Sequence, residues 1–299
     1  MAQFTVIIPT YNRCELTLRA VDSVLAQSLT DFQLILVNDG STDGTEELAD
    51  RYRNRLIYLE QKNLGVSAAR NLGIKAADSP YIAFLDSDDC WFDTKLQAHA
   101  DFIEANPTIR IHQTLEQWHR NGKRVNPRER HLKREGDIFL PSLELCLISP
   151  SASMLHRDLF TEYGLFDENL PACEDYDLWL RITAFEKVGL IEEEHMIRYG
   201  GHDDQLSGIF WGMDRFRVYA VVKLLAESGS KLPPHFKKAA VKTAVKKSEI
   251  LLQGALRRNN HRLAASLEDI IAGLREEDYR NINYQILAGE DLAQEPSRP

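Results

Sequence analysis

The sequence has little cysteine and no long apolar run. Its four cysteines are scattered and form no CxxC pair, which argues against a cysteine-rich zinc site and a disulfide framework. No apolar run approaches the roughly 20 residues that span a bilayer, and the first residues show no basic segment followed by an apolar stretch, so we expect no signal peptide. We therefore expect a cytoplasmic protein with reduced thiols. Peripheral contact with the inner face of a membrane is left open.

A surplus of positive charge is also lacking. The chain has 36 Lys and Arg against 45 Asp and Glu, a formal net charge of -9. A general nucleic-acid binder needs a basic surface to neutralise phosphates, so we expect no nucleic acid partner. The 299 residues, 43% hydrophobic and 27% charged, suffice for one large domain or a domain with an appendage.

Strand and helix patterns alternate through the first ninety residues. Apolar runs at 4–8, 32–37, 56–59 and 81–85 predict buried strands, and the segments between them predict helices at about 13–27, from 45, and at about 66–77. This alternation favours parallel strands with right-handed crossovers. Ligands bind at the carboxyl ends of such strands, where the polar residues that follow each run are expected to converge.

The remainder of the chain is less regular. Residues 106–191 indicate mixed α+β structure, and the stretch 120–134 holds seven Lys and Arg residues. We favour a solvated loop for this stretch over a flap that covers an anionic acceptor or diphosphate. Beyond residue 213, the periodicity predicts helices near 236–252 and 261–274. We favour a hairpin packed on the main domain over a membrane or partner surface, with contact between copies through these helices left open.

The most informative residues follow the fourth apolar run. Asp86, Asp88 and Asp89 lie within four positions, where their charges repel unless a cation lies among them. Hard divalent metals prefer such oxygen ligands. The sequence therefore predicts a metal site that holds a phosphate.

Four motifs in the first ninety residues occur in a characteristic order: residues 9–13 (PTYNR), 38–43 (NDGSTD), 63–71 (NLGVSAARN) and 85–89 (LDSDD). Together they resemble the GT-A fold glycosyltransferases of family 2, over about the first 210 residues. The resemblance implies an α/β fold with a mixed, mainly parallel Rossmann-like sheet flanked by helices. The expected domains are a glycosyltransferase domain at 1–212, split into a nucleotide-sugar-binding half at 1–105 and an acceptor half at 106–212, and a helical extension at 213–299.

The resemblance assigns donor-binding roles to the first two motifs. Asp39 is expected to read the nucleobase, with uracil favoured, and Pro9, Thr10 and Tyr11 are expected to line it. The alternative for Asp39 is a turn or helix cap. Asn38 departs from the family pattern, which usually has another aspartate there.

The other two motifs are expected to hold the diphosphate and the metal. Asp86 and Asp88 match the DxD signature, with Asp88 on Mn²⁺ or Mg²⁺ and Asp86 on the ribose or the metal's water shell. Arg70 either reaches the diphosphate or base or forms a surface salt bridge. Trp91 either forms the floor of the sugar pocket or is a core residue. Asp89 is expected to cap the next turn.

The acceptor half supplies the predicted base and two further ligands. Asp175 is expected to take the proton of the acceptor hydroxyl, and Glu174 to orient the site or bind acceptor; the alternative is that both are first-turn acids of a helix. A polar, loop-like segment contributes His202 as a metal ligand and Arg198 as a diphosphate ligand. In the alternative, His202 is an idle surface residue.

The resemblance implies an inverting, metal-dependent transferase that moves a sugar from a nucleotide-diphospho-sugar, favoured as a UDP-sugar, to a saccharide or lipid-linked acceptor in cell-surface glycan biosynthesis. The absence of a QxxRW motif favours a single-addition enzyme over a processive synthase. Two alternatives stay open. A sugar nucleotidyltransferase is disfavoured because no glycine cluster follows the first strand. A non-catalytic nucleotide-sugar-binding protein is disfavoured by the intact set of acids.

Overall fold

The computed structural model describes residues 2–201 and 210–289, and the chain divides into two compact units. The first unit comprises Met1–Ile138, Leu147–Glu168 and Glu186–His202, and the second comprises Phe139–Cys146, Asn169–Phe185 and Asp203–Pro299. The units are therefore interleaved along the chain. The sequence analysis divided the chain after residue 212. In the structure, the segments Phe139–Cys146 and Asn169–Phe185, which precede that position, belong to the same unit as the C-terminal helices.

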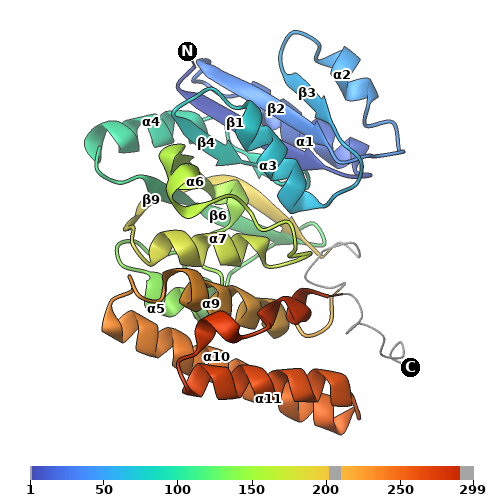
Figure 1. Ribbon diagram of the computed structural model, residues 1–299. Coiled ribbons are helices and arrows are strands. Elements are labelled where there is room, and N and C mark those ends of the chain that lie inside the picture. The colour runs from blue at the N-terminus through green and yellow to red at the C-terminus, as the bar shows by residue number, and fades with distance from the viewer. Residues whose placement is uncertain (1, 202–209, 290–299) are drawn as a thin grey trace. The chain divides into compact units, whose positions relative to one another are not determined.

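The first unit contains a sheet made of nine strands within the described residues (Figure 1). The strands are β1 (Phe4–Thr10), β2 (Phe32–Asn38), β3 (Ile57–Glu60), β4 (Tyr81–Phe84), β5 (Cys90–Trp91), β6 (Ile111–Arg120), β7 (Lys123–Val125), β8 (Ser153–His156) and β9 (Val188–Gly200). The order is β3-β2-β1-β4-β8-β6-β9-β5, with β7 paired to β6. The first four strands pair in parallel, and β8 introduces antiparallel pairing.

Helices cover both faces of the parallel part. The first unit's helices are α1 (Cys14–Leu25), α2 (Glu47–Arg51), α3 (Val66–Ala76), α4 (Lys95–Ala105) and α6 (Asp158–Tyr163), with short 3₁₀ helices η1 (Glu129–His131) and η2 (Pro150–Ala152).

Alternate residues of β1 explain how α1 and α3 come to lie on opposite faces. Phe4, Val6 and Ile8 belong to the same core cluster as α1. Ile7 points the other way, toward α3, where a Cβ added to Gly73 would lie 2.5 Å from the Cγ2 atom of Ile7. Glycine at position 73 therefore permits α3 to approach the sheet closely.

The predicted strands and helices of the first ninety residues are confirmed, with bounds that differ by no more than two residues. Two expectations for the later residues need correction. Arg198, expected in a loop, lies in strand β9. The basic stretch 120–134 is not all loop, because it contains β7 and η1.

The second unit is helical and has a core of its own. Its helices are α5 (Phe139–Ser142), α7 (Glu174–Thr183), α9 (Asp214–Ser228), α10 (Pro234–Arg257) and α11 (His261–Arg275), with η3 (Tyr279–Asn281) and η4 (Tyr284–Ala288). Residues from each of the α-helices named here contribute to one hydrophobic cluster. The predicted helical C-terminal region is thereby confirmed.

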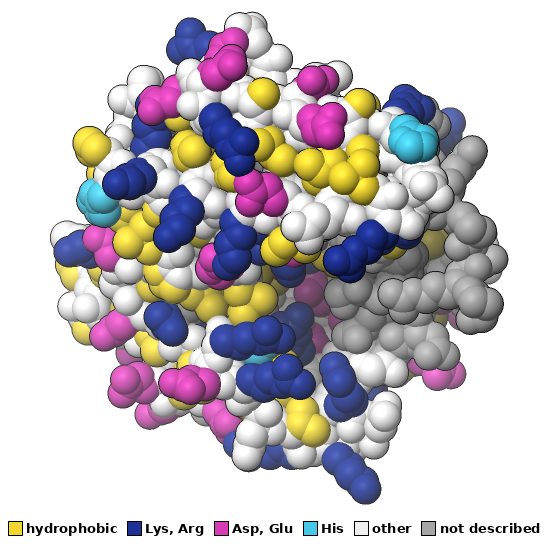
Figure 2. Space-filling model, turned by 90° about the horizontal axis from the view of Figure 1, so that it is seen from below, with side chains coloured by type: hydrophobic (Ala, Val, Ile, Leu, Met, Phe, Trp, Pro, Cys, Tyr) yellow, Lys and Arg dark blue, Asp and Glu magenta, His cyan; other side chains and the backbone are white. Residues whose placement is uncertain are grey.

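The partner surfaces expected for this region stay predictions. Lys238, Lys242 and Lys246 lie exposed on α10. In the view of Figure 2, Lys and Arg side chains are interspersed with acidic and hydrophobic ones, so the visible face is not a field of one charge. Within the described ranges, no helix is long and apolar enough to span a bilayer.

Candidate functional site

The loops that follow β1 and β2 meet at the carboxyl edge of the sheet. Pro9 and Thr10 end β1, and the Asp39 amide donates to the carbonyl oxygen of Thr10 at 2.8 Å. Asn12, in the left-handed region at φ 50°, accepts at its side-chain oxygen from the Thr42 amide at 2.8 Å. The first two motifs thus form one connected surface of the first unit.

The carboxylate of Asp39 is held by donors of the chain itself. One oxygen accepts from Gln61 Nε2 at 2.7 Å and from the Leu64 amide at 2.9 Å, and the other accepts from the Gly65 amide at 2.9 Å. The side chain is buried. These bonds tie the end of β2 to the start of α3 and fix the direction of the carboxylate. The predicted reading of a nucleobase by Asp39 stays a prediction.

The two aspartates of the DxD motif each face an arginine. Arg70 NH2 lies 2.7 Å from Asp86 Oδ1, with the arginine side chain 3% exposed and the aspartate 31%. Arg13 NH1 lies 3.2 Å from Asp88 Oδ2. Arg70 is therefore not the surface salt bridge of the alternative interpretation. Its buried guanidinium, 5.1 Å from the ring of Phe166, holds Asp86 in place.

A third carboxyl lies directly behind this pair. Asp89 is buried, and burial, followed by the charges of Asp88 and Asp86, raises its pKa well above the ordinary range. Its Oδ1 accepts from the Tyr199 amide at 3.0 Å, so Asp89 fastens β9 rather than capping the next turn. Ser151 supports the same loop, since its Oγ accepts from the Asp86 amide at 3.0 Å.

This acidic cluster has the chemistry of a divalent cation site. Asp86 and Asp88 offer oxygen donors of the kind Mn²⁺ and Mg²⁺ prefer, and each of them also faces an arginine. These two carboxylates fit part of a metal site. No group of three or more His, Cys, Asp or Glu within 2–201 and 210–289 is arranged to hold one. The predicted ligand His202 lies outside the described residues.

Two aromatic residues predicted for the site lie in different surroundings. Tyr11 follows β1 and is 45% exposed, so its ring is available to a ligand. Trp91 is 4% exposed within the core cluster, and its Nε1 donates to the Ser151 carbonyl at 2.9 Å. This location agrees with the alternative that Trp91 is a core residue.

In the second unit, the predicted acids open helix α7. Glu174 is buried and Asp175 is partly exposed. The Asp175 carboxylate accepts from the Tyr176 amide at 2.6 Å and from Cys146 Sγ at 3.5 Å. Cys173, just before the pair, has φ 61°, a left-handed conformation that is strained for a side chain of this kind and typical of functional positions.

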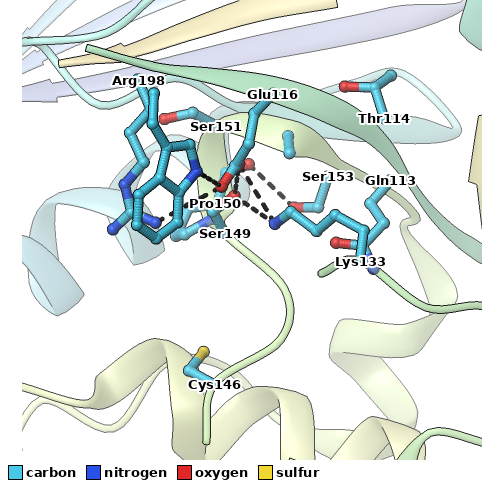
Figure 3. A network of polar contacts seen from close by, with 12 residues as sticks. Gln113, Thr114, Glu116, Lys133, Cys146, Ser149, Pro150, Ser151, Ser153 and Arg198 are labelled. Carbon is cyan, nitrogen blue, oxygen red and sulfur yellow. Dashed lines mark hydrogen bonds and ion pairs between the residues drawn. The ribbon is translucent and has the colours of Figure 1, made fainter. Parts of the chain in front are cut away.

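Arg198 has a partner that the sequence did not indicate. In the parallel register of β6 and β9 it lies opposite Trp118, and its NH1 is 3.7 Å from Oε1 of the buried Glu116. Figure 3 shows Glu116 and Arg198 side by side. Sequence reasoning also missed Ser151 and gave Arg13 no role. Only Arg13 carried a signal, as the last residue of the first motif.

Solved structures establish the class of fold. The S. aureus TarS fragment 1-349 in complex with UDP-GlcNAc has a TM-score of 0.63 with this chain at 18% identity, covering 99% of this chain and 93% of that chain. The mannosyltransferase PcManGT from Pyrobaculum calidifontis, in complex with GDP-Man and Mn2+, has a TM-score of 0.59 at 19% identity, covering 98% and 87%. The fold is therefore that of the GT-A glycosyltransferases.

The sequence defines the family. The model of glycosyl transferase family 2 matches residues 5–164, more than half of the chain. An uncharacterized glycosyltransferase of Rickettsia felis is 37% identical over 192 residues, which are 64% of this chain and 32% of the relative. The chain belongs to glycosyltransferase family 2, which confirms the predicted family and transferase class. It spans about a third of the length of that curated relative.

Proposed function

We propose that the protein is an inverting glycosyltransferase that moves a sugar from a nucleotide-diphospho-sugar to a hydroxyl acceptor. One observation carries the proposal. Asp39, Asp86 and Asp88 follow the carboxyl ends of β2 and β4, strands that flank β1 in parallel, and arginines of the chain face both DxD carboxylates. Such an edge is where open α/β sheets bind nucleotides.

The donor is bound at this edge. Asp39, oriented by its three donors, accepts from the base, for which uracil is the expected identity, and Tyr11 offers its exposed ring as a stacking face. Asp86, held by Arg70, binds the ribose or a metal-bound water. Asp88 and His202 would hold Mn²⁺ or Mg²⁺. When bound, this ion supplies charge stabilisation for the departing nucleoside diphosphate.

The acceptor is activated by Asp175. Its carboxylate accepts from one amide and one thiol, and among the described residues it pairs with no Lys or Arg. It therefore retains the capacity to take the proton of the acceptor hydroxyl as that oxygen attacks the anomeric carbon. Direct displacement by a base-activated hydroxyl inverts the configuration. Glu174 beside it orients the site or binds acceptor.

A single addition to a saccharide or lipid-linked acceptor, in cell-surface glycan biosynthesis, is the role we propose for the reaction. The chain lacks a QxxRW motif, which disfavours processive synthesis. The cytoplasmic location expected from the sequence is part of the same proposal.

A thermal-shift panel of nucleoside diphosphates and their sugars, with and without Mn²⁺, tests the donor assignment. A donor present at 100 times its Kd stabilises the native state by about 2.7 kcal/mol, an increase in Tm of roughly 5–10 °C. The stabilising nucleotide-sugar is then incubated with candidate acceptors, and NMR of the product reports the anomeric configuration. Absence of any nucleotide-dependent stabilisation contradicts the proposal, and pyrophosphate release from a nucleoside triphosphate would favour a nucleotidyltransferase instead.

A further inference from the structure

The buried carboxylate of Glu116, on β6, has more partners than Arg198 alone. It accepts from Trp118 Nε1 at 2.8 Å, from the hydroxyl of Ser149, and from Lys133 Nζ at 3.2 Å. Figure 3 shows Lys133, Ser149 and Arg198 converging on it. Burial works to raise the pKa of Glu116, yet the charges of Lys133 and Arg198 lower it to about 2. Glu116 is therefore ionised and held in place by several donors.

Trp118 connects Glu116 to the basic stretch 120–134. The Arg198 guanidinium lies 5.4 Å from the indole ring centroid, and the His131 ring lies 5.4 Å from the same indole at a tilt of 60°. Arg130 Nε donates to His131 Nε2 at 3.2 Å. Residues far apart in sequence, from β6, η1 and β9, therefore place Arg198 and His131 against one aromatic side chain, with Arg130 bonded to His131.

The charges in this cluster are strongly of one sign. Burial lowers the pKa of His131, and the nearby charges of Arg130, Arg198 and Arg128 lower it further, with Glu116 the opposing influence. Glu116, the acid among these influences, also accepts from three other groups. A local positive field in a chain of net charge -9 favours an anionic ligand at this place.

We propose that Arg198 and His131, which both lie against Trp118, form together with Arg130 a subsite that binds an oxyanion, the phosphate or carboxylate group of a substrate. Guanidinium forks match the oxygens of both groups with paired hydrogen bonds. Glu116 acts as a positioning residue that orients Trp118 and Arg198. The oxyanion belongs either to the donor diphosphate or to an anionic group of the acceptor. This attribution rests on the proposed function, whereas the binding of an oxyanion does not.

NMR titration of His131 with inorganic phosphate tests the subsite without reference to activity. Bound phosphate brings negative charge to the imidazole, so we expect it to raise the pKa of His131 by about one unit. The resonance is assigned by its loss in a His131→Asn variant. In the Arg128→Gln/Arg130→Gln variant, we expect phosphate to bind about tenfold more weakly, because a guanidinium of the subsite and the neighbouring charge of Arg128 are both removed.

Lys123→Gln is the matched control. It removes a positive charge from the same basic stretch, but Lys123 is not among the cations that lower the pKa of His131, so phosphate affinity is expected to be unchanged. Phosphate that leaves the His131 titration unaltered, or that binds equally well to the double variant, overturns the subsite. Either result leaves the donor assignment intact, since that is measured by thermal shift with nucleotides.

A second titration in saturating UDP and Mn²⁺ identifies the source of the oxyanion. If UDP itself raises the pKa of His131 and blocks the effect of phosphate, the subsite serves the donor diphosphate. If phosphate still acts on His131 with UDP bound, the subsite serves an anionic group of the acceptor.

Discussion

The acids of the two units differ in how their charge is compensated. In the first unit, Asp86 and Asp88 each face an arginine. In the second, the donors to Asp175 among the described residues are one amide and one thiol. Two positions further along the same helix, the fully buried Asp177 lies 2.7 Å from Arg181 NH2 and 3.2 Å from Lys223 Nζ.

The difference separates three tasks for one type of side chain. A carboxylate beside an arginine is held in a fixed direction and is suited to binding polar ligands. A carboxylate buried between two cations serves the fold, since its loss removes a partner from both of them. Asp175 pairs with no cation among the described residues. A carboxylate in such surroundings is the one suited to accept a proton. Substitutions that remove each charge with little change in shape test this assignment.

Asp175→Asn is expected to have the largest effect. The amide cannot take a proton, and general-base catalysis contributes about 10²–10⁴-fold, so kcat should fall by about a thousandfold. Donor affinity, measured by calorimetry, should not change because Asp175 is assigned to the acceptor. Turnover at the wild-type rate would remove the base assignment.

Asp177→Asn is the matched control on the same helix, and its effect should appear in stability. Breaking a buried ion pair by removing one partner costs about 3–5 kcal/mol, and here Arg181 and Lys223 both lose a partner. Urea unfolding should show a decrease in the free energy of unfolding of about 3 kcal/mol. The comparison fails if Asp177→Asn is as stable as the wild type, or if Asp175→Asn is destabilised to the same extent.

Asp88→Ala tests the paired acids of the first unit. We expect donor affinity with Mn²⁺ to fall about 100-fold, equivalent to about 2.7 kcal/mol, because the metal's link to the diphosphate is lost. Without Mn²⁺, wild type and variant should bind the donor equally weakly. Asp101→Ala on α4 removes an exposed acid of the same unit as a control. Calorimetry that shows the same Mn²⁺ dependence in Asp88→Ala contradicts the metal assignment.

The sequence predicted well those secondary-structure elements that depend on residues close together in the chain. The apolar runs and the helical periodicity placed β1 to β4 and the helices between them, because hydrophobic spacing within a dozen residues determines such elements. The parallel pairing of these strands followed from their alternation with helices. Convergence of the loops after β1 and β2 then followed from the geometry of a parallel sheet.

What the sequence could not predict depends on contacts between distant residues. Arg13 and Asp88 are 75 positions apart, and Asp86 and Ser151 are 65 apart. No periodicity connects such pairs. Arg198 was expected in a loop because glycines and polar residues follow it, yet pairing with β6 extends β9 to Gly200. Interleaving of the two units has the same origin, since it is decided by tertiary packing.

The smallest expected effect concerns unpaired groups that are buried in the first unit. His99 and His112 are fully buried with ring centroids 4.8 Å apart, and none of their four ring nitrogens has a hydrogen-bond partner among the described residues. Burial, followed by the charge of the adjacent Lys95, lowers the pKa of His112 to about 3. Both imidazoles are therefore neutral in the native state at pH 7.

Acid should destabilise the native state through this pair. Histidine in the unfolded chain has a pKa of about 6.5, so below that pH the unfolded state binds protons that the native state does not. Stability is therefore greatest above pH 6.5 and falls as the pH decreases toward 3. Between pH 7 and pH 5, His112 alone should account for about 2 kcal/mol of the free energy of unfolding.

The His112→Phe variant isolates this contribution. Phe102 stacks on the His112 ring with centroids 4.7 Å apart, so another aromatic ring suits the position. Urea unfolding at pH 7, 6 and 5 should show a smaller loss of stability in the variant, because one group that binds protons only when unfolded is gone. Equal pH dependence in the two proteins would mean that His112 is protonated in the native state. In that case a buried imidazole without a hydrogen-bond partner carries a charge in this protein. The presence or absence of a partner would then not be a valid criterion for separating Asp175 from the carboxylates that pair with cations.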